Sequence, residues 1–81
     1  MSFGSTELCK CLERLGFIRL PQKATSHIKF KPPQGKSLPT GQKNFIMIQL
    51  QRKNYDKHST RRYIRQIQNF GFTEKEILKH L

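Results

Sequence analysis

A histidine flanked by lysines is the clearest group in this chain that could do chemistry. His27 lies in KATSHIKFKPPQGK, residues 23–36, a stretch with four lysines and no acidic residue. If SHIKFK forms a strand, its alternation places His27, Lys29 and Lys31 on one face and the apolar residues between them on the other. Imidazole has an ordinary pKa of about 6.5, so it can take up a proton near neutral pH. The pattern therefore allows a proton-transfer group beside cations that could hold an anion. Most histidines in strands are instead surface or hydrogen-bonded residues, and this alternative stays open from the residues alone.

The net charge favours a polyanionic partner. Sixteen lysines and arginines against five acidic residues give +11 and a pI near 10.3. The surplus is spread along the chain, with seven basic and two acidic residues in 1–40 and nine and three in 41–81. Such a field concentrates polyanions, and each neutralised phosphate releases counterions. Nucleic acid is the first candidate; the alternative is a basic surface that is merely solvated.

The two cysteines indicate free thiols. Cys9 and Cys11 are two residues apart in an expected helix, so they point to different sides and lack the paired spacing of a zinc site. Free thiols favour a reducing compartment. No apolar run approaches the roughly 18–20 residues that span a bilayer, and the first ten residues lack a signal-peptide core. We therefore expect a soluble cytoplasmic protein without a membrane partner.

Hydrophobic periodicity and turn residues predict six elements in one domain, residues 1–81. Three are helices, over residues 5–15, 59–70 and 73–81. The first is expected to be capped by Ser5 or Thr6 and ended by Gly16, and the second to be capped by Ser59 or Thr60 and ended by Gly71. The third begins with a capping box from Thr73 to Glu76. Three are strands: 17–22, limited by Pro21; 26–31; and 45–53.

This order predicts an α+β fold, a small α-β-β-β-α(-α) domain. Its three-stranded antiparallel sheet would be covered by helices on one face only, since two longer helices suffice for one face. The opposite face would stay wet and carry His27, Lys29 and Lys31. This outline is that of a double-stranded-RNA-binding-domain-like fold.

Three stretches resemble the HicA (YcfA-like) toxins of bacterial toxin–antitoxin pairs: ELCKCLERLGFIRLPQK, SHIKF and STRRYIRQIQNFGFTEKEIL. Together, in order and spacing, they cover nearly the whole chain. The resemblance implies an mRNA interferase, an endoribonuclease that cleaves mRNA, held inactive by a HicB-type antitoxin protein. The catalytic histidine of that family would be His27. The RNA-binding residues expected around it are Ser26, Lys23, Lys29 and Lys31.

The chemistry that the resemblance implies needs no metal or other cofactor, because RNA carries its own nucleophile, the 2′-hydroxyl next to each phosphate. His27 would remove this proton as a general base, which contributes roughly 10²–10⁴-fold to a rate. Lys29 and Lys31 could bind the phosphate and offset the charge that develops on it. The reaction would end in a cyclic phosphate. Candidates for the acid that protonates the leaving 5′-oxygen are Lys23, a lysine of the strand, and His27 itself later in the cycle.

The chain departs from the family pattern at several positions. Thr25 stands where the family has the glycine of Gly-Ser-His, and Ile28 stands at a frequent second histidine. Gln49 and Gln51 replace a Pro-x-His often found at the end of the third strand.

Two alternatives to a nuclease remain at this point. One is a non-catalytic RNA-binding module with the same fold, which reads RNA through shape and phosphate contacts. The other is a ribosome-associated or RNA-structural protein. His27→Ala separates a nuclease from a binder, because only a nuclease loses cleavage.

Three further features could have a role. Tyr55 could stack on a base or pack at the start of the second long helix. His58 is expected to be a solvated residue that flanks this helix. The cluster of Arg61, Arg62 and Arg65 could contact phosphate or an acidic antitoxin, or form a solvated helix face.

Overall fold

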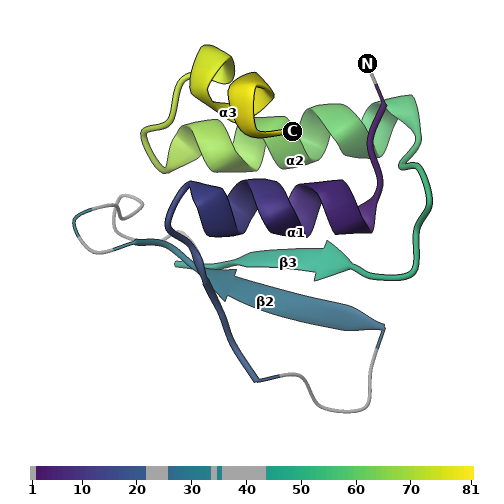
Figure 1. Cartoon of the computed structure of the whole chain (residues 1–81), viewed down its shortest axis with the longest axis horizontal. Helices are drawn as coiled ribbons and strands as arrows, with labels where there is room; N and C mark the ends of the chain where they lie inside the picture. Colours follow the sequence, from purple (N-terminus) through teal and green to yellow (C-terminus); the bar gives the residue numbers. More distant parts are fainter. Residues whose placement is uncertain (1, 22–25, 34, 36–43) are drawn as a thin grey trace.

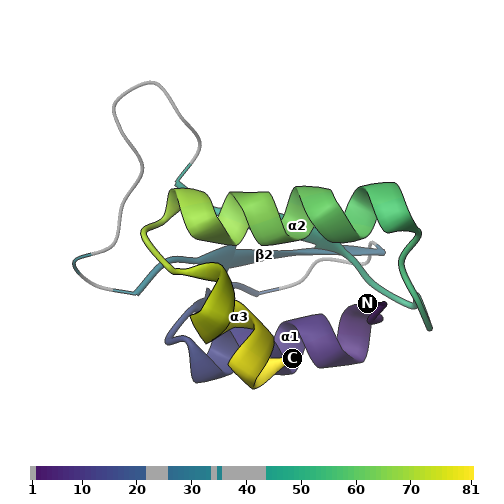
Figure 2. The ribbon, with the colours of Figure 1, turned by 90° about the horizontal axis from the view of Figure 1, so that it is seen from above.

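A computed structural model describes residues 2–21, 26–33, 35 and 44–81. These residues form an α+β fold with three helices and a three-stranded antiparallel sheet in the order β1-β2-β3. The elements are α1 (Ser5–Arg14), β1 (Ile18–Arg19), β2 (His27–Lys31), β3 (Ile46–Gln49), α2 (Lys57–Asn69) and α3 (Glu74–His80). The helices lie on one side of the sheet, with α3 packed against α1 and α2 (Figures 1 and 2). The expected α+β class and element order are confirmed.

The register of the sheet separates its two faces. Four apolar side chains of β2 and β3 are buried beneath the helices and pair across the strands: Ile28 with Ile48, and Phe30 with Ile46. The alternating residues of β2 are exposed. β1 is shorter than its expected span, and Ile18 is 57% exposed opposite Lys31.

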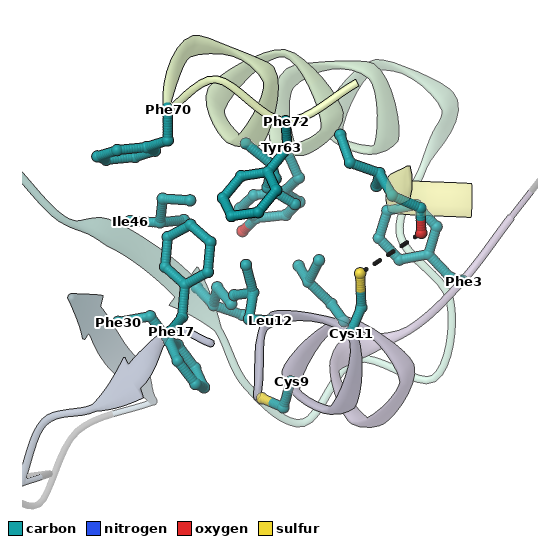
Figure 3. Packing of buried hydrophobic residues seen from close by; sticks show 14 of the residues in the cluster. Phe3, Cys9, Cys11, Leu12, Phe17, Phe30, Ile46, Tyr63, Phe70 and Phe72 are labelled. Carbon is teal, nitrogen blue, oxygen red and sulfur yellow. Dashed lines mark hydrogen bonds between the residues drawn. The ribbon is translucent and has the colours of Figure 1, made fainter. Parts of the chain in front are cut away.

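One hydrophobic core joins the sheet to the helices (Figure 3). Phe17 packs edge-on against Phe70, with ring centroids 5.5 Å apart. The Cys11 thiol donates to the carbonyl of Ile77, 3.6 Å away, so this cysteine ties α1 to α3. Burial raises the pKa of Cys11 to about 11, which keeps it a neutral thiol. Cys9 is also a free, buried cysteine.

The predicted N-caps of both longer helices are wrong. Gly4 caps α1, and its N–H donates to the Glu7 carboxylate at 2.8 Å. Asp56 caps α2 and accepts from the Ser59 N–H at 2.6 Å, so that helix begins two residues earlier than expected.

The stop signals and the third cap were predicted correctly. Gly16 and Gly71 end their helices with φ of 96° and 100°, a conformation that glycine adopts without strain. Thr73 and Glu76 form the capping box of α3. Among the described helices, none has the length and apolar character needed to cross a membrane.

Candidate nucleic-acid interface

The helix-free side of the sheet, here called the open face, carries the predicted group. His27, Lys29 and Lys31 point to it from β2, and all three are exposed to solvent. Each alternates with a buried apolar residue that faces the helices. The predicted shared face is confirmed, and His27 is exposed on it.

Ser26 lies directly beside the imidazole. Its Oγ is 3.5 Å from Nδ1 of His27, at the outer limit of a hydrogen bond. In the tautomer with hydrogen on Nδ1, this N–H donates to Ser26 and Nε2 is the basic nitrogen. In the other tautomer the Ser26 hydroxyl donates to Nδ1, so this contact is compatible with a basic Nε2 but does not select it.

The strand lysines extend along the open face away from His27. The Lys29 ammonium lies 4.8 Å from the centre of the Phe45 ring, in a cation–π contact. His27 pairs with Gln49 and Lys29 with Met47, so Phe45 lies toward the opposite end of β3 from the His27 pair. These lysines extend the basic surface of the open face along β2. Lys23 and Thr25 lie outside the described residues.

Gln49, named above only as a departure from the family pattern, lies beside His27 and connects it to Arg52, which the sequence did not indicate. The Leu50 N–H donates to the Ser26 carbonyl at 2.7 Å, so the adjacent pair, His27 and Gln49, is a non-hydrogen-bonded pair. Side chains of such a pair approach each other most closely. In the amide orientation that satisfies both partners, the Gln49 oxygen accepts from Nη2 of Arg52 at 2.9 Å and from Nε at 3.3 Å. A guanidinium therefore stands at the His27 end of the open face.

Two tyrosines fix the backbone of Gln49 from the core side. The Tyr55 hydroxyl donates to the Gln49 carbonyl at 2.6 Å, and the Tyr63 hydroxyl accepts from its N–H at 3.2 Å. The two rings are 4.8 Å apart, and Tyr55 is 6% exposed. Burial raises the pKa of Tyr55 well above its ordinary range, so the hydroxyl remains a donor. Of the two roles considered for Tyr55, the structure supports packing.

Arg52 is anchored through its main chain to the start of α1. Its carbonyl accepts from the N–H of Ser5 at 2.8 Å and from Oγ of Ser5 at 3.1 Å, and its N–H donates to that Oγ at 3.2 Å. Ser5, expected to cap α1, instead holds the segment after β3. Gln51 precedes Arg52 with φ of 60°, an uncommon conformation for a residue other than glycine.

Acidic side chains are absent from the part of the sequence that forms the sheet. No aspartate or glutamate occurs between Glu13 and Asp56, whereas nine lysines and arginines do. Glu13 pairs with Arg19 at 3.6 Å, and Asp56 caps α2. Within the described residues, no three His, Cys, Asp or Glu side chains are grouped as metal ligands would be. The open face can therefore attract an anion without a competing carboxylate from the strands.

The other positions considered lie on the helices. Arg61, Arg62 and Arg65 are exposed on α2, as expected. His58 is exposed too, but it lies in the first turn of α2 and not before it.

Comparisons of the chain with protein-family models, with curated proteins and with solved structures find no match. The functional argument therefore rests on the residues of this chain.

Proposed function

We propose that this protein is a HicA-type toxin, an endoribonuclease that cleaves mRNA with His27 as its catalytic base. The observation that carries the proposal is an exposed imidazole on a cationic sheet face whose strands contribute no carboxylate. The α-β-β-β-α order, with helices on one side, supports a double-stranded-RNA-binding-domain-like fold, which leaves the open face for a ribose-phosphate chain.

The proposed reaction is transesterification without a metal ion. Nε2 of His27 takes the 2′-hydroxyl proton while the 2′-oxygen attacks the adjacent phosphorus. The new bond from the 2′-oxygen to phosphorus forms as the bond to the 5′-oxygen breaks. The products are a 2′,3′-cyclic phosphate and a 5′-hydroxyl. The 5′-oxygen gains its proton from a lysine of this face or from the imidazolium that the first transfer creates.

A cleavage assay with chelator tests this function. Purified protein is incubated with a long single-stranded mRNA in the presence of EDTA, and fragments are resolved by length. His27→Ala should reduce cleavage by roughly 10²–10⁴-fold, with little change in RNA affinity. His58→Ala is the matched control and should cleave like the wild type, since His58 lies on α2. Equal cleavage by the wild type and His27→Ala would contradict the catalytic role.

The same assay separates the alternative, a non-catalytic RNA-binding module. The basic open face supports this function as well, because phosphate contacts alone can supply affinity. A binder leaves the RNA intact with all three proteins, and His27→Ala only weakens its affinity.

The proposal includes a HicB-type antitoxin whose acidic patch covers the open face. Ile18 and Met47 are 57% and 43% exposed there, so such a partner would gain apolar contact beside the cations. The candidate is a small protein encoded by the neighbouring reading frame. Diethyl pyrocarbonate, which modifies accessible histidines, should modify His27 less in the complex while His58 remains reactive. Equal modification of both histidines in the complex would contradict occlusion of the site.

A further inference from the structure

We infer that Arg52, held in place by Gln49, is the phosphate-binding residue of the His27 site. Its ligand would be the two non-bridging oxygens of the RNA phosphate beside the attacking 2′-hydroxyl. This inference rests on the proposed function, and it names the group that stabilises the transition state.

The register carries the first step of the argument. His27 and Gln49 form a non-hydrogen-bonded pair, so their side chains are direct neighbours on the open face. The Gln49 amide in turn binds the Arg52 guanidinium. Imidazole, amide and guanidinium thus follow one another across the end of the sheet. The proposed phosphate lies beside the Gln49 amide, between His27 and Arg52.

The way Arg52 is held leaves it able to bind an anion. Gln49 accepts from Nε and Nη2, which is one edge of the guanidinium. The two Nη1 hydrogens and one on Nη2 remain, and this second edge matches two phosphate oxygens. Because an amide is neutral, it orients the guanidinium without cancelling its charge. Among the described residues, the one carboxylate within 4.0 Å of an arginine is that of Glu13, paired with Arg19.

The main chain on either side of Arg52 is built to hold it. Three hydrogen bonds with Ser5 fix its main chain: the Arg52 carbonyl accepts two of them, and the Arg52 N–H donates the third. The left-handed conformation of Gln51 turns the chain directly after β3, so that the next side chain returns to Gln49. Uncommon backbone conformations of this kind are often found at functional sites. Arg52 is thus exposed at its tip but fixed at its base.

A cavity of about 300 Å³ lies at this end of the sheet, lined by Gln49, Arg52, Asn54, Tyr55, Asp56 and Ser59. Asp56 would repel an anion deep in this cavity. Its carboxylate is engaged by the Ser59 N–H, and the pKa of Asp56 lies below its ordinary value for this reason. The phosphate would therefore sit at the His27 side of the guanidinium, away from Asp56.

The chemistry explains why this position matters. Negative charge builds on the non-bridging oxygens as the 2′-oxygen attacks phosphorus, and a pre-oriented pair of N–H donors stabilises that charge. Removal of one such donor in other enzymes costs about 10²–10³-fold in kcat. Lys29 is a weaker candidate, because its ammonium lies over Phe45.

Variants of Arg52 test the inference on the same mRNA. Arg52→Ala should lower kcat by about 10²–10³-fold. Arg52→Lys should recover only part of this loss, because a lysine keeps the charge but lacks the two parallel N–H donors of a guanidinium. Arg14→Ala removes the same charge from α1, on the helical side, and should cleave like the wild type. If Arg52→Ala cleaves as fast as Arg14→Ala, the inference is wrong.

Gln49 is a positioning residue, and a double-mutant cycle separates this role from a general structural one. Gln49→Ala should reduce kcat less than Arg52→Ala. The double variant should be no slower than Arg52→Ala, since Gln49 acts through Arg52. Additive losses would contradict this role.

Binding to 2′-O-methyl RNA, which cannot be cleaved through its blocked 2′-oxygen, keeps the inference separate from the nuclease proposal. Affinity is measured over a range of salt concentrations. Arg52→Ala should make the slope of log K against log salt shallower by about one phosphate contact, and Arg14→Ala should not. If the wild type cleaves no RNA, the nuclease proposal fails, and these slopes alone decide whether Arg52 binds phosphate. Equal slopes for wild type and Arg52→Ala would overturn the phosphate site.

Discussion

Gly4 is where the start of α1 meets the segment that carries Arg52, and Gly4→Ala is expected to separate them. A Cβ at this position would collide with the carbonyl of Lys53 and lie 2.5 Å from that of Arg52. Both are backbone atoms, so the collision cannot be relieved by a change of rotamer. The backbone of Gly4 itself would tolerate alanine, because its φ of −112° and ψ of −172° form an extended conformation that alanine adopts freely. The substitution therefore still gains stability from the reduced entropy of the unfolded chain.

Two opposing effects set the magnitude. Replacing glycine where the backbone permits alanine stabilises a protein by about 0.4–1 kcal/mol through the unfolded state. Overpacking costs about 1–3 kcal/mol, and each hydrogen bond lost between Ser5 and Arg52 adds about 1 kcal/mol. The expected net loss is about 2–3 kcal/mol, which lowers Tm by roughly 10–20 °C in a domain of this size.

Thermal unfolding followed by circular dichroism measures this loss. Gly35→Ala is the control, because Gly35 has φ of 88° and a Cβ there would meet no atom of the described residues within 4 Å. Gly35→Ala should lower the free energy of unfolding by only about 1–2 kcal/mol, the cost of an alanine in the left-handed conformation. RNA cleavage should fall in Gly4→Ala even below its Tm, since Arg52 moves with its anchor. A Tm for Gly4→Ala at or above that of the wild type would refute the reasoning.

Three other perturbations have defined outcomes. Tyr55→Phe removes the donor to the Gln49 carbonyl and should cost about 1–2 kcal/mol in urea unfolding; an unchanged midpoint would contradict this bond. Burial raises the pKa of Cys11 from 9.0 to about 11, so the folded state resists loss of this proton. The free energy of unfolding should therefore be undiminished below pH 9 and fall by roughly 2 kcal/mol by pH 11. In Cys11→Ala the fall over the same pH range should be smaller. Hydrogen bonds from Ser59 lower the pKa of Asp56, so the stability that the Asp56 carboxylate contributes should be present above pH 3.8 and lost as pH falls through the lowered pKa. Asp56→Ala should lower Tm, whereas Asp56→Asn retains the cap.

Local sequence patterns were sufficient for the α+β class, the order of the elements and the exposed histidine. The alternation around His27 predicts which residues face solvent, because a strand buried on one side must repeat with a period of two. Gly16 and Gly71 mark helix ends because each supplies a positive φ at a defined place. These features depend on neighbours in the chain and can be read without the tertiary structure.

The contact between Arg52 and Gln49 could not be found in this way. A strand continued through residue 53 would direct Arg52 to the buried side, but β3 ends at Gln49 and the chain turns at Gln51. The cap of α1 failed for a related reason: the close contact of Gly4 with residues 52 and 53 joins segments far apart in sequence. Both features depend on tertiary contacts that a single sequence does not display.

The nucleophile of the reaction offers the most direct test of the central claim. Once the cleavage position in an RNA strand is mapped, the wild-type protein is given that strand and an otherwise identical strand with a 2′-deoxy sugar at the scissile nucleotide. If His27 activates the ribose hydroxyl, the intact strand is cut to a cyclic phosphate and the deoxy strand is not cut at that position. Equal rates on the two strands would contradict the account.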